Sequence, residues 1–391
     1  MSDHPAAREQ KHSLAASPPV PGGELARPNC FLNSDSSASR RGNLLSKLDS
    51  LKVTSLVCMA SLVLMSCSTR PSKESATGDR PTELNVCTSS TSSTTVTPTF
   101  ALDKGIFDKY GLKVTVTQID SGSRSVAAMI SGDVQLCQMS GSAVVNAVVA
   151  GADLAIIAGL VNNQVYSLMV PAGIRSAADL KGKAVSVSAP GSGSESGMRS
   201  ALKILGLRPD RDVAILAIGG QGERMAALEA GYVAGTLVSP PETTLARLKG
   251  HHTLLDMSTM DLPLPHTTIA TSRAFIKSDR ATVLSFMKAI SEAVFMMKQD
   301  RESSLETLSK YLQVDRSREA ASLEETFEVI IKGKMADKPY PAEAGIEALL
   351  REISAENPSA AEVKPEQITD STIVRELEDS GFFRDLFRRK R

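Results

Sequence analysis

The 391-residue chain has no tryptophan, and aromatic residues make up only 4% of it. This shortage weighs against an aromatic cage for a quaternary ammonium ligand. Histidine is also scarce, with five residues, and His251, His252 and His266 have neither metal-ligand spacing nor a cysteine partner. We therefore expect no metal, no cofactor and no histidine-based catalysis.

Charge of one sign is not in excess either, because Lys plus Arg and Asp plus Glu both number 44. No global field therefore points to nucleic acid as a partner. The glycine-rich segment 191–194 (GSGS) lacks both the lysine of a P-loop and the G-x-G-x-x-G spacing of a dinucleotide site. The adjoining segment 194–197 (SESG) is not the G-x-S-x-G turn of a serine hydrolase.

Long hydrophobic runs are missing, since spanning a bilayer needs about 20 apolar residues. A shorter uncharged run, 53–66, follows basic residues at 40, 41, 47 and 52. It ends in Leu64, Met65, Ser66 and Cys67, which resembles a bacterial lipobox except for Met65 at the position before Ser66. We expect 44–67 to be a lipoprotein signal peptide with lipid on Cys67, so that the rest of the chain is anchored to a membrane in the periplasm or at the cell surface.

The segments on either side of this signal have no sign of a packed core. Residues 1–43 are rich in Ser, Pro, Ala and Arg without apolar periodicity. A signal peptide normally begins its chain, so we expect initiation near Leu44 or Leu45, or else a disordered leader. Residues 68–81 are predicted to be a flexible tether spanning roughly 20 Å. The remaining residues, 82–391, are long enough for two domains.

Strand, turn and helix patterns alternate along this remaining chain. Strands are predicted at 83–87, 112–119, 134–137 and 154–158, with helices at 100–110, 126–131 and 143–150. A second set follows, with strands at 184–187, 213–218 and 235–238 and helices at 198–205, 223–230 and 242–248. A strand at 267–271 returns to the first set, and 279–299 begins a helical C-terminal region.

This alternation predicts an α/β fold with parallel strands and helices on both faces. We expect two Rossmann-like lobes joined by a two-crossing hinge. Lobe 1 comprises 82–170 and 269–391, the second part being helical, and lobe 2 comprises 171–268.

Small hydroxylated residues and glycines follow most of the predicted strands and precede helices. Ligands of open α/β sheets bind outside the carboxyl ends of the strands, and helix N-termini there attract anionic groups. Any one such turn is as well explained as an ordinary helix cap, but the turns recur. The candidate ligand-binding residues are Ser89, Ser90, Thr91, Ser123, Ser140, Ser142, Gly191, Ser192, Gly193, Ser194, Gln221, Ser239 and Glu242.

Several segments together resemble one family of periplasmic solute-binding proteins. They are GIFDKYGL at 105–112, SGDV at 131–134, GAD at 151–153, DLKGK at 179–183, APGS at 189–192, ALEAG at 227–231, the Pro240-Pro241 pair and ELEDSGF at 376–382. The sequence is similar to the branch with the type 2 binding fold that serves ABC importers of nitrate, sulfonates, taurine and thiamine-pyrimidine precursors. It departs at Gln135 and Ala234, where the family often has Asp, which we interpret as structural differences.

The resemblance implies a monomeric binding protein whose two lobes close on a solute and dock on a permease. The cysteine-rich iron motif of the pyrimidine synthases in this superfamily is missing, which disfavours enzymatic activity. An anion such as a sulfonate or nitrate suits the hydroxyl-rich turns, and Arg124 is a candidate for its charge partner. A pyrimidine precursor would need stacking on Phe100, Tyr166 or Tyr232, and a sensory or scaffold lipoprotein is a third alternative.

Two cysteines, Cys87 and Cys137, lie in the body of the chain near the ends of strands that the family fold places side by side. A disulfide needs Cα atoms within about 7 Å in a specific geometry, and a free buried cysteine packs as a small hydrophobe. We expect two free thiols rather than a bridge.

Overall fold

The computed structural model describes residues 80–355 and 357–388. The predicted leader (1–43), the predicted signal peptide (44–67) with Cys67, and the predicted tether up to residue 79 lie outside the described residues. Within the described ranges, no helix is long and apolar enough to cross a membrane.

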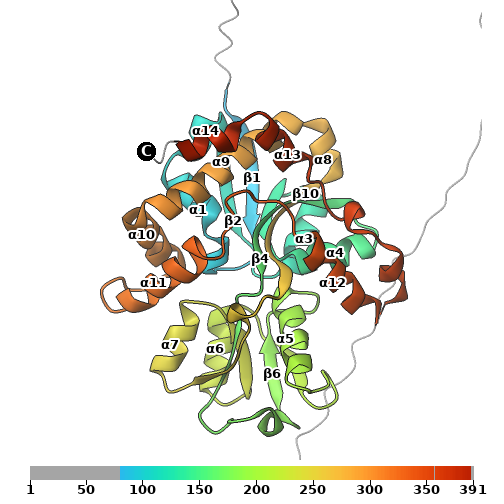
Figure 1. The fold of residues 1–391 in the computed structure, drawn as a ribbon, viewed down its shortest axis with the longest axis vertical. Coiled ribbons are helices and arrows are strands. Elements are labelled where there is room, and N and C mark those ends of the chain that lie inside the picture. The colour runs from blue at the N-terminus through green and yellow to red at the C-terminus, as the bar shows by residue number, and fades with distance from the viewer. Residues whose placement is uncertain (1–79, 356, 389–391) are drawn as a thin grey trace, which may run out of the picture. The chain divides into compact units, whose positions relative to one another are not determined.

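The sheet of lobe 1 has five strands in the order β2–β1–β3–β10–β4 (Figure 1). Strand β1 (Thr82–Thr88) pairs in parallel with β2 (Leu112–Gln118) and β3 (Leu136–Met139). Strand β10 (Pro263–Ser272) runs antiparallel to β3 and to β4 (Leu154–Asn163). The all-parallel sheet predicted from the strand–helix rhythm is therefore wrong at β10, because that strand enters from lobe 2 rather than through a crossover helix.

Helices cover both faces of this sheet, and the alternation of side chains along each strand supplies both cores. Val86 packs in the cluster that contains Phe107 and Phe286, whose rings stack at 5.6 Å, whereas its neighbour Cys87 packs in the opposite cluster. The helices of lobe 1 are α1 (Thr97–Asp103), α2 (Ile106–Lys109), α3 (Gly122–Ser131), α4 (Gly141–Val149), α8 (Arg273–Ser278), α9 (Arg280–Gln299), α10 (Arg301–Leu312), α11 (Ala320–Thr326), a π-helical turn (Phe327–Lys332), α12 (Glu343–Ser354), α13 (Thr372–Asp379) and α14 (Phe382–Arg388).

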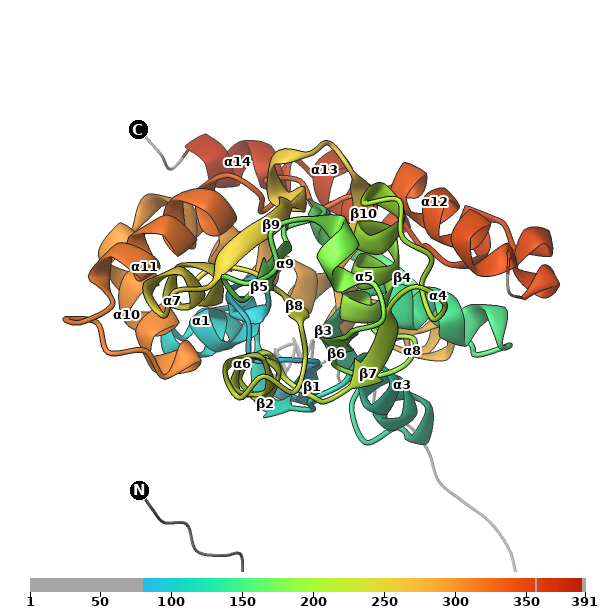
Figure 2. The ribbon, with the colours of Figure 1, turned by 90° about the horizontal axis from the view of Figure 1, so that it is seen from below.

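The sheet of lobe 2 has the order β7–β6–β8–β5–β9. Strands β6 (Ala184–Val187), β7 (Ala214–Ala217) and β8 (Gly235–Val238) are parallel, and β5 (Ser167–Val170) is antiparallel to β8 and to β9 (His252–Asp256). Figure 2, which looks onto this lobe, shows α5 on one side of the sheet and α6 and α7 on the other. The bounds of these helices are α5 (Gly193–Ile204), α6 (Gln221–Glu229) and α7 (Glu242–Leu248).

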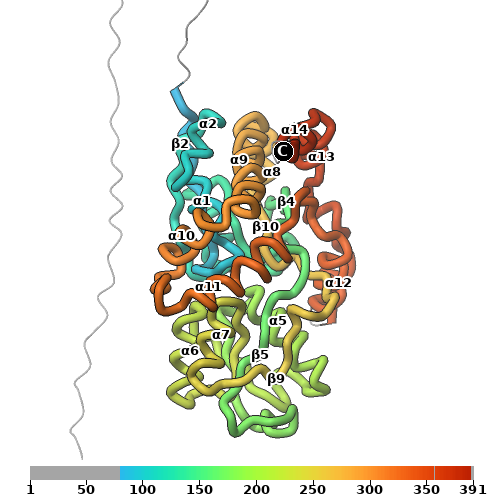
Figure 3. Tube along the Cα trace, turned by 60° about the vertical axis from the view of Figure 1, so that its left-hand side comes forward, coloured from blue at the N-terminus to red at the C-terminus, as the bar shows by residue number. Residues whose placement is uncertain are grey.

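Lobe 2 is inserted between β4 and β10 through two connecting segments, at 164–166 and 257–262 (Figure 3). The segments are bonded to each other, since the backbone N–H of Gln164 donates to the carbonyl of Leu262 at 3.1 Å. Strand β5 thus lies in the second sheet, and both crossings come a few residues before the predicted boundaries at 170 and 268.

The predicted helix at 100–110 is broken at Gly105, which has φ +63° between α1 and α2. Glycine adopts this left-handed conformation without the steric cost that a side chain brings.

The departure from the family pattern at Gln135 has a structural explanation. Its side chain accepts from the backbone N–H of Asn85 at 2.9 Å and donates to the carbonyl of Gly132 at 3.1 Å. The amide thus links the entry of β3 to β1.

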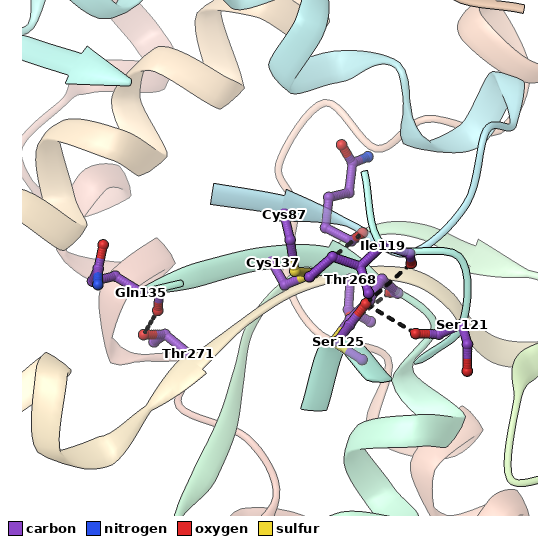
Figure 4. Close-up of a disulfide and its surroundings, with 10 residues drawn as sticks. Cys87, Ile119, Ser121, Ser125, Gln135, Cys137, Thr268 and Thr271 are labelled. Carbon is purple, nitrogen blue, oxygen red and sulfur yellow. Dashed lines mark hydrogen bonds between the residues drawn. A yellow bond between two sulfur atoms is a disulfide. The ribbon is translucent and has the colours of Figure 1, made fainter. Parts of the chain in front are cut away.

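Cys87 and Cys137 form a disulfide (Figure 4). The two residues are direct partners in the parallel β1–β3 pairing, with Cα atoms 4.4 Å apart. The prediction of two free thiols is therefore wrong. The prediction failed because it depended on the pairing register of β1 and β3. The cysteines are 50 residues apart, and nothing local in the sequence reveals that they face each other across adjacent strands.

Candidate ligand-binding site

A cavity lies where the carboxyl ends of strands from both sheets face each other. It holds about 60 Å³ of space open to the centre of a water molecule, and its wall is rich in hydroxyl groups. The lining residues come from both lobes and from the connecting segments. They are Ser89, Ser90, Ser92, Thr94, Thr95, Asp120, Ser121, Gly122, Ser140, Tyr166, Ser188, Ser192, Gly193, Ser194, Gly220, Gln221, Arg224, His266 and Thr267.

Lobe 1 contributes mainly hydroxyl groups to this wall. Ser89 and Ser90 follow β1, and Ser140 follows β3. Part of this hydroxyl array organises the loops, since Ser140 accepts from the backbone N–H of Ser142 at 3.3 Å and Thr95 donates to the carbonyl of Ser90 at 2.8 Å. The lobe-1 wall is therefore neutral and polar, apart from the exposed carboxylate of Asp120.

Three helices begin at the cavity, namely α3 at Gly122, α5 at Gly193 and α6 at Gln221. The first turn of an α-helix carries unpaired N–H groups and about half a positive charge. Ser192 caps α5 by accepting from the backbone N–H of Glu195 at 3.2 Å. The convergence of three positive helix ends favours an anionic ligand.

Lobe 2 adds a buried cation, Arg224, which is only 2% exposed. Its guanidinium donates to three neutral acceptors: the carbonyl of Gly219 at 2.6 Å, Thr236 Oγ1 at 3.2 Å and the carbonyl of Leu237 at 3.1 Å. No carboxylate lies within 4 Å of it among the residues that the structure describes. Burial lowers the pKa of Arg224, and the more distant charges of Glu242 and Glu223 oppose this shift only in part.

Gln221, one helical turn before Arg224, presents an unused donor. Its Oε1 accepts from the backbone N–H of Ser239 at 3.0 Å, which fixes the orientation of the amide. Its Nε2 is buried and has no hydrogen-bond partner in the described part of the chain. A buried donor without an acceptor is costly, and an anion in the cavity would satisfy it.

Tyr166, on the first connecting segment, and His266, in β10, pack edge to face with ring centroids 4.6 Å apart. Burial lowers the pKa of His266 to about 3 and raises the pKa of Tyr166, with the charge of Arg224 opposing the latter shift. Both rings are therefore neutral at physiological pH. The two rings therefore add polar groups to the cavity wall but no charge.

The lobes touch beside the cavity. Ser93 Oγ donates to the carbonyl of Pro240 at 2.6 Å, and Asn146 donates to the carbonyl of Gly191 at 3.4 Å. Gly193 lies so near Ser140 that a Cβ atom on it would be 2.4 Å from Ser140 Oγ. The two lobes are thus in direct contact at the edge of the cavity in this structure.

Of the candidate residues from the sequence, seven line the cavity: Ser89, Ser90, Ser140, Ser192, Gly193, Ser194 and Gln221. The other six lie beside it. Ser142 and Gly191 line a neighbouring groove, Ser239 positions Gln221, and Glu242 lines a cavity between α6 and α7. Ser123 bonds to Ser121 at 3.0 Å, and Thr91 belongs to the loop after β1 without lining the cavity.

Arg224 is the main residue that sequence reasoning missed. The proposed charge partner, Arg124, is exposed and bonds to the backbone carbonyl of Asp120 instead. A signal for Arg224 existed, because a residue three positions after Gln221 lies on the same face of a helix. Tyr166, considered from the sequence only as a stacking partner for a pyrimidine, also lines the cavity. The other lining residues not singled out as ligand contacts were Ser92, Thr94, Thr95, Asp120, Ser121, Gly122, Ser188, Gly220, His266 and Thr267.

The fold and this site between two lobes define a periplasmic-binding-protein architecture. The chain belongs to the NMT1/THI5-like family, whose sequence model matches residues 94–303, more than half of the chain. No curated protein sequence matches it.

Solved structures share the fold. The alkanesulfonate-binding protein of Xanthomonas axonopodis pv. citri, bound to MOPS, is 20% identical with a TM-score of 0.61, and the match covers 73% of this chain and 96% of that one. The periplasmic aliphatic sulphonate binding protein of Escherichia coli is 20% identical with a TM-score of 0.60, covering 74% and 92%. The periplasmic nitrate-binding protein of Synechocystis PCC 6803 is 14% identical with a TM-score of 0.64, covering 76% and 89%. The predicted fold and family are confirmed.

Proposed function

We propose that this chain is the extracytoplasmic, lipid-anchored solute-binding component of an ABC importer, and that it captures a small oxyanion of the sulfonate or nitrate kind between its lobes for delivery to a permease. The observation that carries the proposal is the pair formed by Arg224 and Gln221. One is a buried cation without a carboxylate within ion-pair distance in the described chain, and the other is a buried donor without an acceptor. Both line the same cavity.

The size of the cavity supports a small ligand. A buried water needs roughly 10–15 Å³ on this measure of volume, so about 60 Å³ holds about four to six water-sized groups. Nitrate and methanesulfonate are of this size. A pyrimidine precursor is larger and would need aromatic stacking, yet Phe100 is buried in the lobe-1 core and Tyr232 is 80% exposed. Tyr166 is the one of the three that lines the cavity.

The disulfide supports the proposed location. Structural disulfides form and persist in oxidising compartments such as the bacterial periplasm, and Cys87 and Cys137 are both fully buried. Together with the lipobox at Leu64 to Cys67, this favours a body that folds outside the cytoplasm.

Calorimetric titration with nitrate, methanesulfonate and taurine tests the ligand class. Arg224→Gln removes the positive charge, and a charge-assisted hydrogen bond contributes roughly 1.5–3 kcal/mol. The variant should therefore bind the preferred anion about 10- to 150-fold more weakly. The matched control is Arg211→Gln, which changes an exposed arginine of lobe 2. Equal affinities of wild type and Arg224→Gln would refute the role of this site.

X-ray scattering tests the clamp, because binding between two lobes should reduce the radius of gyration at saturating anion. An unchanged radius would count against capture between the lobes.

A further inference from the structure

The ligand cavity is lined by a carboxylate as well as by a cation. Among the residues that the structure describes, the charged side chains of its wall are Arg224 from lobe 2 and Asp120 from lobe 1. The other lining residues are serines, threonines, glycines, Tyr166, Gln221 and the neutral His266. A plain anion such as nitrate would compensate Arg224 but would also meet the negative charge of Asp120. The two side-chain charges of the wall therefore suit a ligand that carries both signs.

The position of Asp120 is fixed by the residues on either side of it. The backbone N–H of Ile119 donates to the carbonyl of Thr88 at 2.8 Å, and that of Ser121 donates to the carbonyl of Ser89 at 3.1 Å. Both flanking residues thus lie against the end of β1 (Figure 4). Ser121 has φ +144°, a strained conformation for a residue with a side chain. A loop held in this way presents Asp120 to the cavity with little freedom left to lose on binding.

The carboxylate of Asp120 makes few contacts within the protein. It is exposed, and one of its oxygens accepts from Gln118 Nε2 at 2.7 Å. Ser121, rather than Asp120, occupies the N-cap position of α3. Arg124 donates to the backbone carbonyl of Asp120 and does not line the cavity, and no basic side chain of the described chain lies within ion-pair distance of the carboxylate. The second carboxylate oxygen therefore remains available to a donor in the cavity.

An ammonium group on the ligand would complete this arrangement, because it offers both the opposite charge and several N–H donors. Asp120 is exposed although it lines the cavity, so it lies where the cavity opens to solvent. Arg224 and Gln221 are buried. A short zwitterion would therefore place its anionic end inside, at these two donors, and its ammonium group at the mouth.

We propose that Asp120 determines the class of ligand, so that this site takes a small organic anion that also carries an ammonium group in preference to a plain anion of the same size. The proposal rests on the proposed function of the Arg224 cavity. Asp120 attracts the ammonium group and repels plain anions, and both effects contribute to the difference in affinity. Because Arg224 belongs to lobe 2 and Asp120 to lobe 1, such a ligand joins the lobes through its two charges.

The test is calorimetric titration of the whole protein at pH 7 with two pairs of probes. Taurine and isethionate share a sulfonate and a two-carbon chain, and differ by an ammonium group in place of a hydroxyl. β-Alanine and 3-hydroxypropanoate make the same comparison with a carboxylate, and methanesulfonate and nitrate are the plain anions. A charge pair at a solvated mouth contributes less than a buried one. In the pair that binds, the ammonium member should therefore bind about 5- to 30-fold more tightly.

Asp120→Asn removes the charge and keeps both the shape of the side chain and the acceptor for Gln118. The preference should fall below about 2-fold, because the ammonium probe binds more weakly while its hydroxyl analogue binds equally or more tightly. Asp133→Asn is the matched control and should keep the wild-type preference, since it changes an exposed aspartate at the opposite end of β3. The wild-type preference requires no variant and decides the ligand class even if Asp120→Asn does not fold.

The outcomes separate the two proposals. If none of the probes binds, the proposed function and this inference both fail. If methanesulfonate or nitrate binds while the ammonium probes bind no more tightly than their hydroxyl analogues, the inference alone fails. A preference that persists in Asp120→Asn, or an equal loss of both members of a pair, overturns the assignment to this residue.

Discussion

Gly193→Ala should prevent the lobes from closing while leaving each lobe folded. The added Cβ would lie 2.4 Å from Ser140 Oγ and 2.8 Å from Ser140 Cβ. Rotation of the serine side chain can move Oγ but not Cβ, so the two backbones must separate by several tenths of an ångström. Gly193 is in lobe 2 and Ser140 in lobe 1, and the separation therefore opens the cavity that both residues line.

The magnitude follows from the cost of overpacking, which is roughly 1–3 kcal/mol for an added methyl or methylene group in a tight contact. If this cost falls on the closed state, affinity for methanesulfonate should drop about 5- to 150-fold. The free protein should not lose stability. Gly193 has no positive φ and starts α5, where alanine is the better helix former by up to about 1 kcal/mol.

A double-variant cycle isolates the contact. Ser140→Gly removes both clashing atoms and replaces a helix cap by glycine, which costs only about 0.3 kcal/mol. In that background Gly193→Ala should cost less than about 0.5 kcal/mol in binding, as for residues that no longer touch. The control is Gly222→Ala in the first turn of α6, where an added Cβ meets nothing within 4 Å.

Calorimetry gives the affinities, and thermal unfolding without ligand gives the stabilities. Wild-type affinity in Gly193→Ala, or an equal loss with and without Ser140, would show that the lobes do not close through this contact.

Three further results are expected. Reduction of the Cys87–Cys137 bridge should lower the free energy of unfolding by about 4 kcal/mol from loop entropy across 50 residues, measured as a shift in urea midpoint; an unchanged midpoint would contradict it. Glu242→Gln should gain stability relative to the wild type as pH rises from 5 to 7. Burial raises the folded-state pKa of Glu242 to about 7, so over this range the unfolded wild type releases a proton that the folded protein keeps, and the wild type loses at most about 1.4 kcal/mol of stability per unit. A constant difference between pH 5 and 7 would refute the burial of a neutral carboxyl. Fatty-acid labelling in cells should mark the wild type and not Cys67→Ala, and label in the variant would exclude lipid on that cysteine.

The sequence predicted those features that local patterns encode. Apolar patterns located β1, β2 and β6, and the glycine and serine turns located Ser140, Gly193 and Gln221 at the cavity. These signals are local because a strand end and a helix start must occur within a few residues of each other.

The features that the sequence did not reveal depend on long-range register. Cys87 faces Cys137 only because β1 and β3 are neighbours in that alignment. Arg224 lines the cavity because α6 packs with that face toward the carbonyls of Gly219 and Leu237. Glu242 was predicted at the ligand on the same reasoning as Gln221, yet α7 directs it to the far side of α6. Turn chemistry alone cannot distinguish these two orientations.

The proposed division of labour between the lobes follows from where the charges lie. Arg224, Gln221 and the N-termini of α5 and α6 belong to lobe 2, whereas lobe 1 offers hydroxyl groups and the N-terminus of α3. Attraction of an anion therefore resides mainly in lobe 2 even when the lobes are apart. Lobe 1 gains contact with the ligand only on closure, and a ligand shifts that equilibrium only by its extra affinity for the closed form. On the proposed function, the neutral hydroxyl wall, rather than the cation, would thus determine which bound anions close the lobes.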